Sequence, residues 1–172
     1  MKKAMAILTL CTITLACFVL FAVSQGFRIN YSHSAPVGLW KVNYFQKEVR
    51  RGELMEVCPP DVPIVKMFIE KGYLQSGACP SGSVPFLKPL VALSGDVINI
   101  TEKGISVNGH LLKNSQRRGG ISSMPNGKYL VEEGYAWFVS SFDPVSFDSR
   151  YFGAVSIMNI IGSAKPILTF KN

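Results

Sequence analysis

The sequence lacks the short motifs by which many hydrolases and nucleotide-binding proteins are identified. It contains no GxSxG, no HExxH and no glycine-rich loop that could cradle a phosphate. Its only two histidines, His33 and His110, lie far apart, and no CxxC pair occurs, so the spacing typical of a metal site is missing. We therefore expect neither a metal ion nor any other cofactor.

Acidic residues are also few, with 11 Asp and Glu against 18 Lys and Arg, which gives a net charge of +7 at pH 7. The basic residues are scattered, as at 47–51 and 117–118, and no aromatic stripe lies between them. Because a nucleic-acid groove needs a concentrated basic face, we do not expect nucleic acid as a partner. The pattern favours a basic, solvated surface close to anionic lipid headgroups.

One uncharged run of 20 residues, Ala4–Val23, is apolar except for three threonines. Outside it the hydrophobic content falls from 48% to about 43%, slightly below that of an average globular domain. A helix of this length spans about 30 Å, the thickness of a bilayer core. Lys2 and Lys3 precede the run, so the positive-inside rule places the N-terminus in the cytoplasm.

The alternative to a membrane anchor is a cleaved signal peptide. Its apolar region would be about 7–15 residues long and would end in a small-x-small cleavage site, which residues 21–25 do not offer. We therefore expect a cytoplasmic tip at 1–3, a single-pass signal anchor at 4–23 in the inner (cytoplasmic) membrane, and a periplasmic domain at 24–172.

Cys58 and Cys79 are the only cysteines outside the apolar run. In an oxidising compartment, two cysteines about 20 residues apart can close a loop, which stabilises a fold by roughly 3 kcal/mol. We predict a disulfide, with two buried free thiols as the alternative.

Residue patterns predict a mainly β domain with one short helix. Asp61 is the predicted N-cap of that helix. Val65, Phe68 and Ile69 fall on one of its faces, and Gly72 stops it. The Asn-Gly pair at 108–109 is a strong hairpin signal. Extended segments are predicted at 27–34, 39–45, 54–57, 84–93, 96–100, 105–107, 111–112, 128–132, 135–140 and 151–157.

Two serines before a proline are candidates for chemistry. If their segment is extended, Ser32 and Ser34 share one face and could supply a nucleophile and a second hydroxyl for an oxyanion. Spacing alone favours ordinary turn serines before Pro36. His33 would point to the opposite face from Ser34, so lysine is the most plausible base for an activated serine.

Two charged positions are further candidates, each with an ordinary structural alternative. Lys88 is a lone charge in an apolar run, where desolvation could lower its pKa by about 3 units, a cost of roughly 4 kcal/mol. It could equally be an edge-strand lysine that prevents aggregation. Asp148 and Arg150 would pair on one face of a strand, or form a surface ion pair worth less than about 1 kcal/mol.

Three ordered segments behind the apolar run together resemble the type I signal peptidase family. They are Ser34–Trp40, the Lys88 segment leading into 95–98, and Asp148–Gly153. The SxPxGLW form of the first segment, the cysteine pair and the small size are similar to the TraF branch, whose members are peptidases of conjugative transfer systems that mature the pilin. The resemblance covers nearly the whole chain.

The resemblance implies a role for each candidate residue. Ser34 would be the nucleophile and Lys88 its general base. Ser32 would lend a hydroxyl to the oxyanion hole, and Ser146 would orient the lysine. It also implies an antiparallel β domain with a hydrophobic surface facing the membrane.

In the TraF branch the aspartate that corresponds to Asp148 matters for activity, and Asp148 and Arg150 would brace the site. The chain departs from the wider family at three places: Ser94 replaces a proline, Pro89 replaces an arginine, and the Gly-Asn-Asn before the last segment is replaced by residues 141–144. These departures favour a specialised substrate and leave the serine–lysine pairing intact.

The implied function is a membrane-anchored serine endopeptidase that processes the propilin of a conjugative type IV secretion system. Water or the pilin's own N-terminal amine would resolve the acyl-enzyme, the latter giving a cyclic subunit. Expected partners are a membrane-bound propilin or preprotein, inner-membrane lipid and other conjugative transfer proteins. The alternatives are a general leader peptidase and a non-catalytic anchored scaffold.

Overall fold

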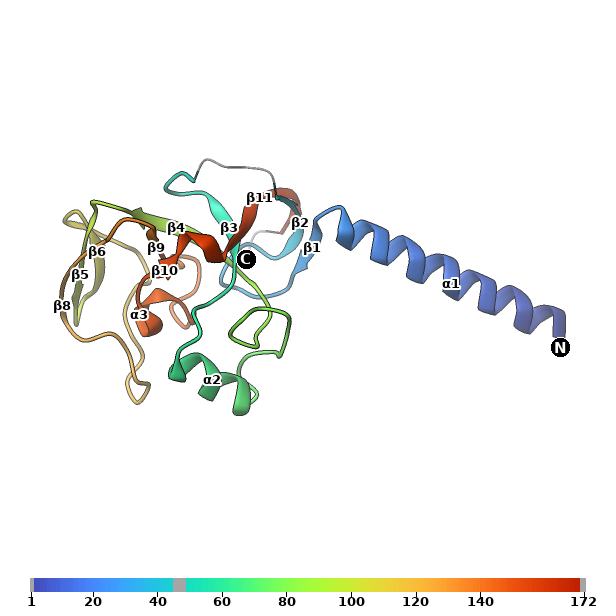
Figure 1. The fold of residues 1–172 in the computed structure, drawn as a ribbon, viewed down its shortest axis with the longest axis horizontal. Helices are drawn as coiled ribbons and strands as arrows, with labels where there is room; N and C mark the ends of the chain where they lie inside the picture. Colours follow the sequence, from blue (N-terminus) through green and yellow to red (C-terminus); the bar gives the residue numbers. More distant parts are fainter. Residues whose placement is uncertain (1, 45–48, 171–172) are drawn as a thin grey trace.

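A long helix projects from a β domain in the computed structural model, which describes residues 2–44 and 49–170 (Figure 1). Helix α1 (Lys2–Ser24) buries none of its side chains and is long and apolar enough to cross a membrane. The hydroxyls of Thr9, Thr12 and Thr14 donate to backbone carbonyls three or four residues earlier, so these polar groups are satisfied without water. The predicted helix is confirmed, and its insertion into a bilayer stays a prediction.

Two antiparallel sheets form the β domain within the described ranges. In spatial order, the seven-stranded sheet contains β1 (Phe27–Asn30), β2 (Gly38–Asn43), β11 (Ile160–Thr169), β3 (Leu54–Val57), β4 (Phe86–Leu93), β9 (Tyr135–Phe138) and β10 (Val155–Ser156). The four-stranded sheet contains β7 (His110–Leu111), β6 (Gly104–Val107), β5 (Val97–Thr101) and β8 (Gly127–Leu130). The mainly antiparallel β fold predicted from the sequence is confirmed.

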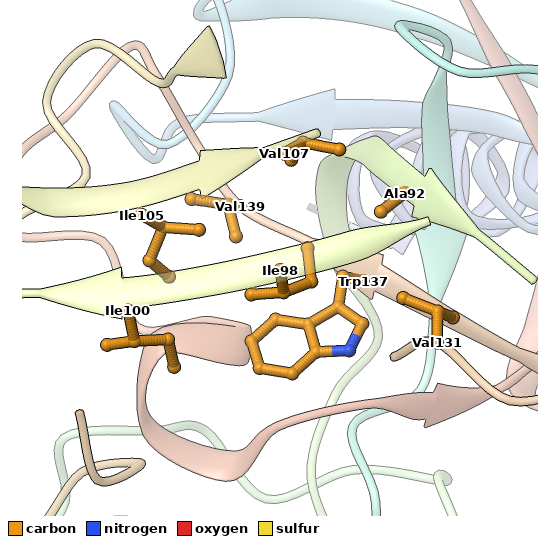
Figure 2. Packing of buried hydrophobic residues seen from close by; sticks show 8 residues of the cluster. All are labelled: Ala92, Ile98, Ile100, Ile105, Val107, Val131, Trp137 and Val139. Carbon is orange, nitrogen blue, oxygen red and sulfur yellow. The ribbon is translucent and has the colours of Figure 1, made fainter. Parts of the chain in front are cut away.

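A shared core joins the two sheets. Figure 2 shows Ile98 and Ile105 of the four-stranded sheet packed with Trp137 of β9, and all three side chains are almost fully buried. The turn between β4 and β5 is fixed by Asp96, whose carboxylate accepts from the Leu93 N–H at 2.8 Å and from Asn108 Nδ2 at 2.8 Å. The four-stranded sheet lies at the end of the domain that is far from α1 (Figure 1).

Most predicted strands are confirmed to within two residues at each end. They are those at 54–57, 84–93, 96–100, 105–107, 111–112, 128–132 and 135–140. The hairpin at 108–109 is also confirmed, with φ of 50° at Asn108 and 85° at Gly109, the left-handed values that this turn requires. The strand predicted at 39–45 is β2, and Phe45 lies outside the described residues.

The predicted helix α2 spans Pro63–Glu70, but Asp61 is not its N-cap. The helix begins after Val62, which makes no side-chain cap, and the Asp61 carboxylate pairs instead with Lys66 at 2.9 Å. Of the three apolar residues predicted on one face, Val65 and Phe68 are buried and Ile69 is partly buried. Pro63 occupies the first turn, where its missing N–H costs nothing and its fixed φ suits a helix.

Two predictions about local structure are wrong, and two elements were not predicted. The segment at 27–34 is extended only to Asn30, after which residues 32–35 turn. Residues 149–152 form a short helix, α3 (Ser149–Phe152), because the Asp148 carboxylate caps its first turn; only Val155 and Ser156 of the predicted strand at 151–157 pair in β10. A 3₁₀ turn at Ile157–Asn159 and the long strand β11 follow, neither of which was predicted.

The predicted disulfide between Cys58 and Cys79 is present, with the two Cα atoms 5.5 Å apart. It joins the segment after β3 to a small hairpin closed by a bridge between Ser76 and Ser83. The cysteines are 21 positions apart in the sequence, and the residues between them include α2 and the chain that leads back toward β4. The disulfide therefore holds this excursion against the seven-stranded sheet.

Candidate active site

A cleft of about 770 Å³ brings together residues from segments far apart in the sequence. Ser32, Ser34, Lys88 and Ser146 all line it. Its remaining lining is largely aliphatic and aromatic and includes Ile29, Trp40, Leu74, Phe86, Val145 and Phe147. Four of the six predicted site residues thus share one apolar cleft, while Asp148 and Arg150 are not part of its lining.

Ser34 lies in a tight turn between β1 and β2, so the face-sharing argument for Ser32 and Ser34 is wrong even though both reach the cleft. Asn30, the last residue of β1, organises this turn. Its side-chain amide donates to the backbone carbonyls of Ser32, Ala35 and Pro36 at 2.9–3.0 Å. The turn is therefore held from inside by one amide group.

The next part of the motif is held by packing as well as hydrogen bonding. The Trp40 indole N–H donates to the Pro36 carbonyl at 3.0 Å, and its ring is 2% exposed. Gly38 has a φ of 148°, and a Cβ at this position would collide with the Leu168 carbonyl of β11. Glycine and tryptophan are therefore needed here to seat the serine turn against β11.

Lys88 is a buried amine inside the sheet. It is 5% exposed, and β4 pairs with β3 on one side and β9 on the other, which excludes the edge-strand interpretation. Its Nζ donates to Ser146 Oγ at 2.5 Å and lies 5.7 Å from the centroid of the Phe86 ring. Lys88 and Ser146 are therefore in contact in the free protein, as an orienting role for Ser146 requires.

Burial lowers the pKa of Lys88 to about 8 from its ordinary value of 10.5, because the ammonium loses its hydration. The carboxylate of Asp148 opposes this by raising the pKa, the guanidinium of Arg150 lowers it further, and Asp143 raises it. A substantial fraction of the amine is therefore neutral at slightly alkaline pH and able to accept a proton.

Asp148 and Arg150 form a fully buried ion pair, not a surface one. Arg150 Nη2 lies 2.7 Å from Asp148 Oδ2, Arg150 Nε lies 2.8 Å from Oδ1, and both side chains are 0% exposed. The guanidinium also donates to carbonyls of two loops, those of Asn114 at 2.8 Å and Pro144 at 3.2 Å. The pair therefore ties three segments together behind the cleft.

Two polar residues of the site were missed by the sequence analysis, Asn30 and Ser140. Ser140 is 0% exposed, and its hydroxyl donates to the Ser34 carbonyl at 2.6 Å. A sequence signal exists for Asn30, since asparagine often bonds the backbone two residues on. Ser140 has no such signal, because its partner lies 106 residues away in the chain.

The two serine hydroxyls differ in how they are held. Ser32 Oγ donates to Asn30 Oδ1 at 3.0 Å, which keeps it in the turn. Within the described residues, no hydrogen bond involves Ser34 Oγ, and Lys88 Nζ bonds Ser146. Catalytic hydrogen bonds often tighten only when substrate is bound, so this free-state geometry is compatible with proton transfer between Ser34 and Lys88.

The buried amine, the serine turn and the β architecture agree with the family to which the sequence assigns this protein. The chain belongs to the family described as signal peptidase, peptidase S26, whose sequence model matches residues 2–169. It is therefore a serine peptidase of the signal peptidase class.

The proteins to which it is similar include several conjugative transfer proteins. It is 31% identical to "Conjugal transfer protein TraF" of Agrobacterium tumefaciens over 173 residues, which covers 98% of this chain and 97% of that one. It is 34% identical to "Plasmid transfer protein TraF" of Escherichia coli over 159 residues, covering 87% and 86%. A solved signal peptidase I from Enterococcus faecalis is 18% identical, with a TM-score of 0.39, and the match covers 68% of this chain and 97% of that one.

Proposed function

We propose that this protein is a membrane-anchored serine endopeptidase that processes the propilin of a conjugative type IV secretion system. The observation that carries the chemistry is the buried amine of Lys88, with a pKa of about 8, in the same cleft as Ser34. The names of the relatives support the place of the reaction, because they are conjugal and plasmid transfer proteins.

In the acylation step, neutral Lys88 accepts the proton of Ser34 Oγ as that oxygen forms a bond to the scissile carbonyl carbon. The Ser34 N–H and the Ser32 hydroxyl stabilise the oxyanion, a role worth about 3–4 kcal/mol per donor. For this the Ser32 hydroxyl rotates away from its hydrogen bond to Asn30. Lys88 then gives the proton to the leaving amine as the C–N bond breaks. Ser146 keeps the lysine aimed throughout, through its 2.5 Å hydrogen bond.

In the deacylation step, Lys88 removes a proton from the incoming nucleophile, which attacks the ester carbon and releases Ser34. Water as the nucleophile gives a linear pilin. The pilin's own N-terminal amine gives a cyclic one, and the proton taken from that amine returns to Ser34. Intact-mass measurement of the product distinguishes the two, because the cyclic chain is lighter by one water.

The substrate binds as an extended peptide along the free edge of β1. β1 is the edge strand of the seven-stranded sheet, and Ile29 beside the cleft is 77% exposed. An added strand would gain main-chain hydrogen bonds here, while the apolar cleft admits small side chains. The anchor α1 would hold this edge at the periplasmic surface of the inner membrane, with the N-terminus in the cytoplasm and residues 24–172 in the periplasm. The disulfide supports this topology, because disulfides persist in an oxidising compartment.

The test is processing of the propilin, reconstituted with the enzyme in phospholipid vesicles. Ser34→Ala and Lys88→Ala should each reduce the rate at least a hundredfold, since each removes a group that bonds or transfers a proton in the transition state. Lys66→Ala is the matched control, because Lys66 is an exposed lysine of α2 that pairs with Asp61, and this variant should retain the wild-type rate. Full processing by both site variants would reject the proposal.

The second candidate function is a general leader peptidase. Family membership favours it equally, because the family is described as signal peptidase. Cleavage of several unrelated secreted preproteins at rates comparable to that of the propilin would establish it, whereas selective cleavage of the propilin supports the conjugative role.

A further inference from the structure

We propose that Ser140 is a positioning residue for the nucleophile, and that the Asp148–Arg150 pair acts on Ser34 through it. This inference rests on the proposed function, in which Ser34 is the nucleophile. It assigns a task to a buried serine that the sequence motifs do not include and gives the buried ion pair a route to the reacting atoms.

The side chain of Ser140 touches the serine turn directly. Its hydroxyl donates to the Ser34 carbonyl at 2.6 Å and accepts from the Phe142 N–H at 3.1 Å. Ser140 is 0% exposed, so water cannot replace either bond without rearrangement. The O–H and one lone pair of this hydroxyl thus join the nucleophile's backbone to the segment that follows β9.

The main chain of Ser140 is held by the ion pair from both sides. Its N–H donates to Asp148 Oδ2 at 3.0 Å, and its carbonyl accepts from Arg150 Nη2 at 3.3 Å. These two charged groups therefore fix the position from which the Ser140 hydroxyl reaches Ser34.

The carboxylate of Asp148 has no hydrogen bond to spare for the reacting residues. Oδ1 accepts from the backbone N–H and Nε of Arg150, and Oδ2 accepts from Nη2 of Arg150 and from Ser140. Within the described residues, none of its bonds goes to Lys88 or Ser34. Its hydrogen-bonded route to the nucleophile therefore passes through Ser140.

A fixed carbonyl at Ser34 matters because it fixes the peptide plane that follows the nucleophile. That plane, together with the Asn30 amide that holds the Ala35 carbonyl at 3.0 Å, limits rotation of the Ser34 backbone and so aims its Oγ. Ser34 Oγ itself makes no hydrogen bond within the described residues, so the held backbone fixes the direction of the Cα–Cβ bond and thereby the three staggered positions that Oγ can occupy. A misplacement of about 1 Å at a reacting atom costs on the order of a hundredfold in rate.

The experiment compares two equally buried serines in the full chain, with propilin in phospholipid vesicles as substrate. Ser140→Ala removes the bond to Ser34, and Ser149→Ala removes a hydroxyl that accepts from the Phe138 N–H at 3.0 Å. Both are 0% exposed, so both should lower Tm by similar amounts. Ser140→Ala should reduce kcat roughly 10- to 100-fold with KM and the midpoint of the pH–rate profile unchanged, and Ser149→Ala should keep kcat within about threefold of wild type.

Coupling to the ion pair is measured with Asp148→Asn. If Asp148 positions Ser34 through Ser140, the double variant with Ser140→Ala should have a kcat within about twofold of that of the more damaged single variant. Losses that multiply would show independent routes and overturn this part of the proposal.

Other outcomes also decide the matter. A kcat within twofold of wild type for Ser140→Ala, or a loss seen only in KM or in the pH midpoint, would overturn the positioning role. If Ser140→Ala does not fold, Ser140→Cys keeps the size with a weaker donor, and a wild-type kcat for this variant would overturn the role as well. Full activity of Ser34→Ala would instead reject the proposed function itself.

Discussion

Lys88 is the general base of the proposed mechanism, and burial of its ammonium lowers the free energy of unfolding. Its folded pKa of about 8 lies below its ordinary value of 10.5, so below pH 8 the folded protein must hold a buried ammonium that the unfolded chain keeps hydrated. Each pKa unit corresponds to about 1.4 kcal/mol, so this cost is on the order of 3 kcal/mol. It diminishes as the pH rises from about 8 toward 10.5, because the unfolded chain then loses its proton too.

Lys88→Met should therefore stabilise the protein while abolishing processing. At pH 7 we expect the free energy of unfolding to increase by roughly 1–3 kcal/mol, since the apolar side chain needs no hydration and the lost bond to Ser146 offsets part of the gain. Near pH 10.5 the gain should largely vanish. Thermal melts of the two proteins across this pH range measure the effect, and a gain that did not depend on pH would contradict the buried-ammonium explanation.

In the proposed mechanism the same amine sets the pH dependence of the reaction. Since the base must be neutral, kcat/KM should rise with pH to a plateau with a midpoint near 8. Asp148→Asn removes a carboxylate that raises the pKa of Lys88, so the midpoint should move to lower pH while the maximal rate falls. A midpoint that moved upward would mean that Asp148 does not stabilise the ammonium.

How far the sequence predicts the site depends on how local each contact is. Ser34, Lys88 and Ser146 could be proposed because each lies within a recognisable segment. Ser140 could not, because its role arises only when the segment after β9 meets the turn before β2. Burial of the Asp148–Arg150 pair was likewise out of reach, since the loops that cover it come from residues 114–116 and 140–144.

At the scale of elements, the disulfide supports one wall of the cleft. The segment between Cys58 and Cys79 contains α2 and ends near Leu74, which lines the cleft and packs against the core beneath β4. We therefore expect loss of the disulfide to affect substrate binding in the cleft as well as the stability of the fold.

Replacing Cys58 and Cys79 with alanine should lower the free energy of unfolding by roughly 3 kcal/mol and raise KM, with a smaller effect on kcat. Replacing Cys11 and Cys17 of α1 is the matched control, because these are free thiols and their loss should change neither value. Denaturant titration with and without reductant measures the first effect. Equal stability of the two double variants would contradict a structural role for the bond.

Helices and strands were predicted correctly where the local sequence pattern alone specifies the structure that the element has in the fold. The hairpin at 108–109 needs only its own turn chemistry, and β3 is a short run bounded by Gly52 and a proline pair. β11 was missed because Gly162 and Pro166 interrupt its pattern, although its pairing with β2 shifts register between Pro166 and Leu168 to accommodate the break. Helix α3 was missed because its stability comes from a buried cap and not from its own four residues.

At the scale of the whole molecule, α1 adds little to the packing of the β domain. No residue of α1 is buried, while both sheets and their cores lie after Gly26. The helix therefore contributes location more than stability to the domain.

Deletion of residues 1–24 should leave a domain with a Tm within a few degrees of that of the full chain. It should cleave a soluble peptide spanning the pilin cleavage site at a similar rate, but process vesicle-held propilin at least tenfold more slowly, because the effective concentration that the anchor supplies is lost. An equal loss on both substrates would mean that α1 shapes the site itself.

The joint between helix and sheet is short and braced. Only Gln25 and Gly26 separate α1 from β1, the Arg28 guanidinium donates to the Val23 carbonyl at 2.9 Å, and the Lys41 ammonium donates to the Gln25 carbonyl. With α1 embedded in a bilayer, this joint would hold the site at one fixed height above the lipid surface. Propilins lengthened between their membrane span and the cleavage point should then be cut progressively more slowly, which makes depth, beyond sequence, a criterion by which a substrate is chosen.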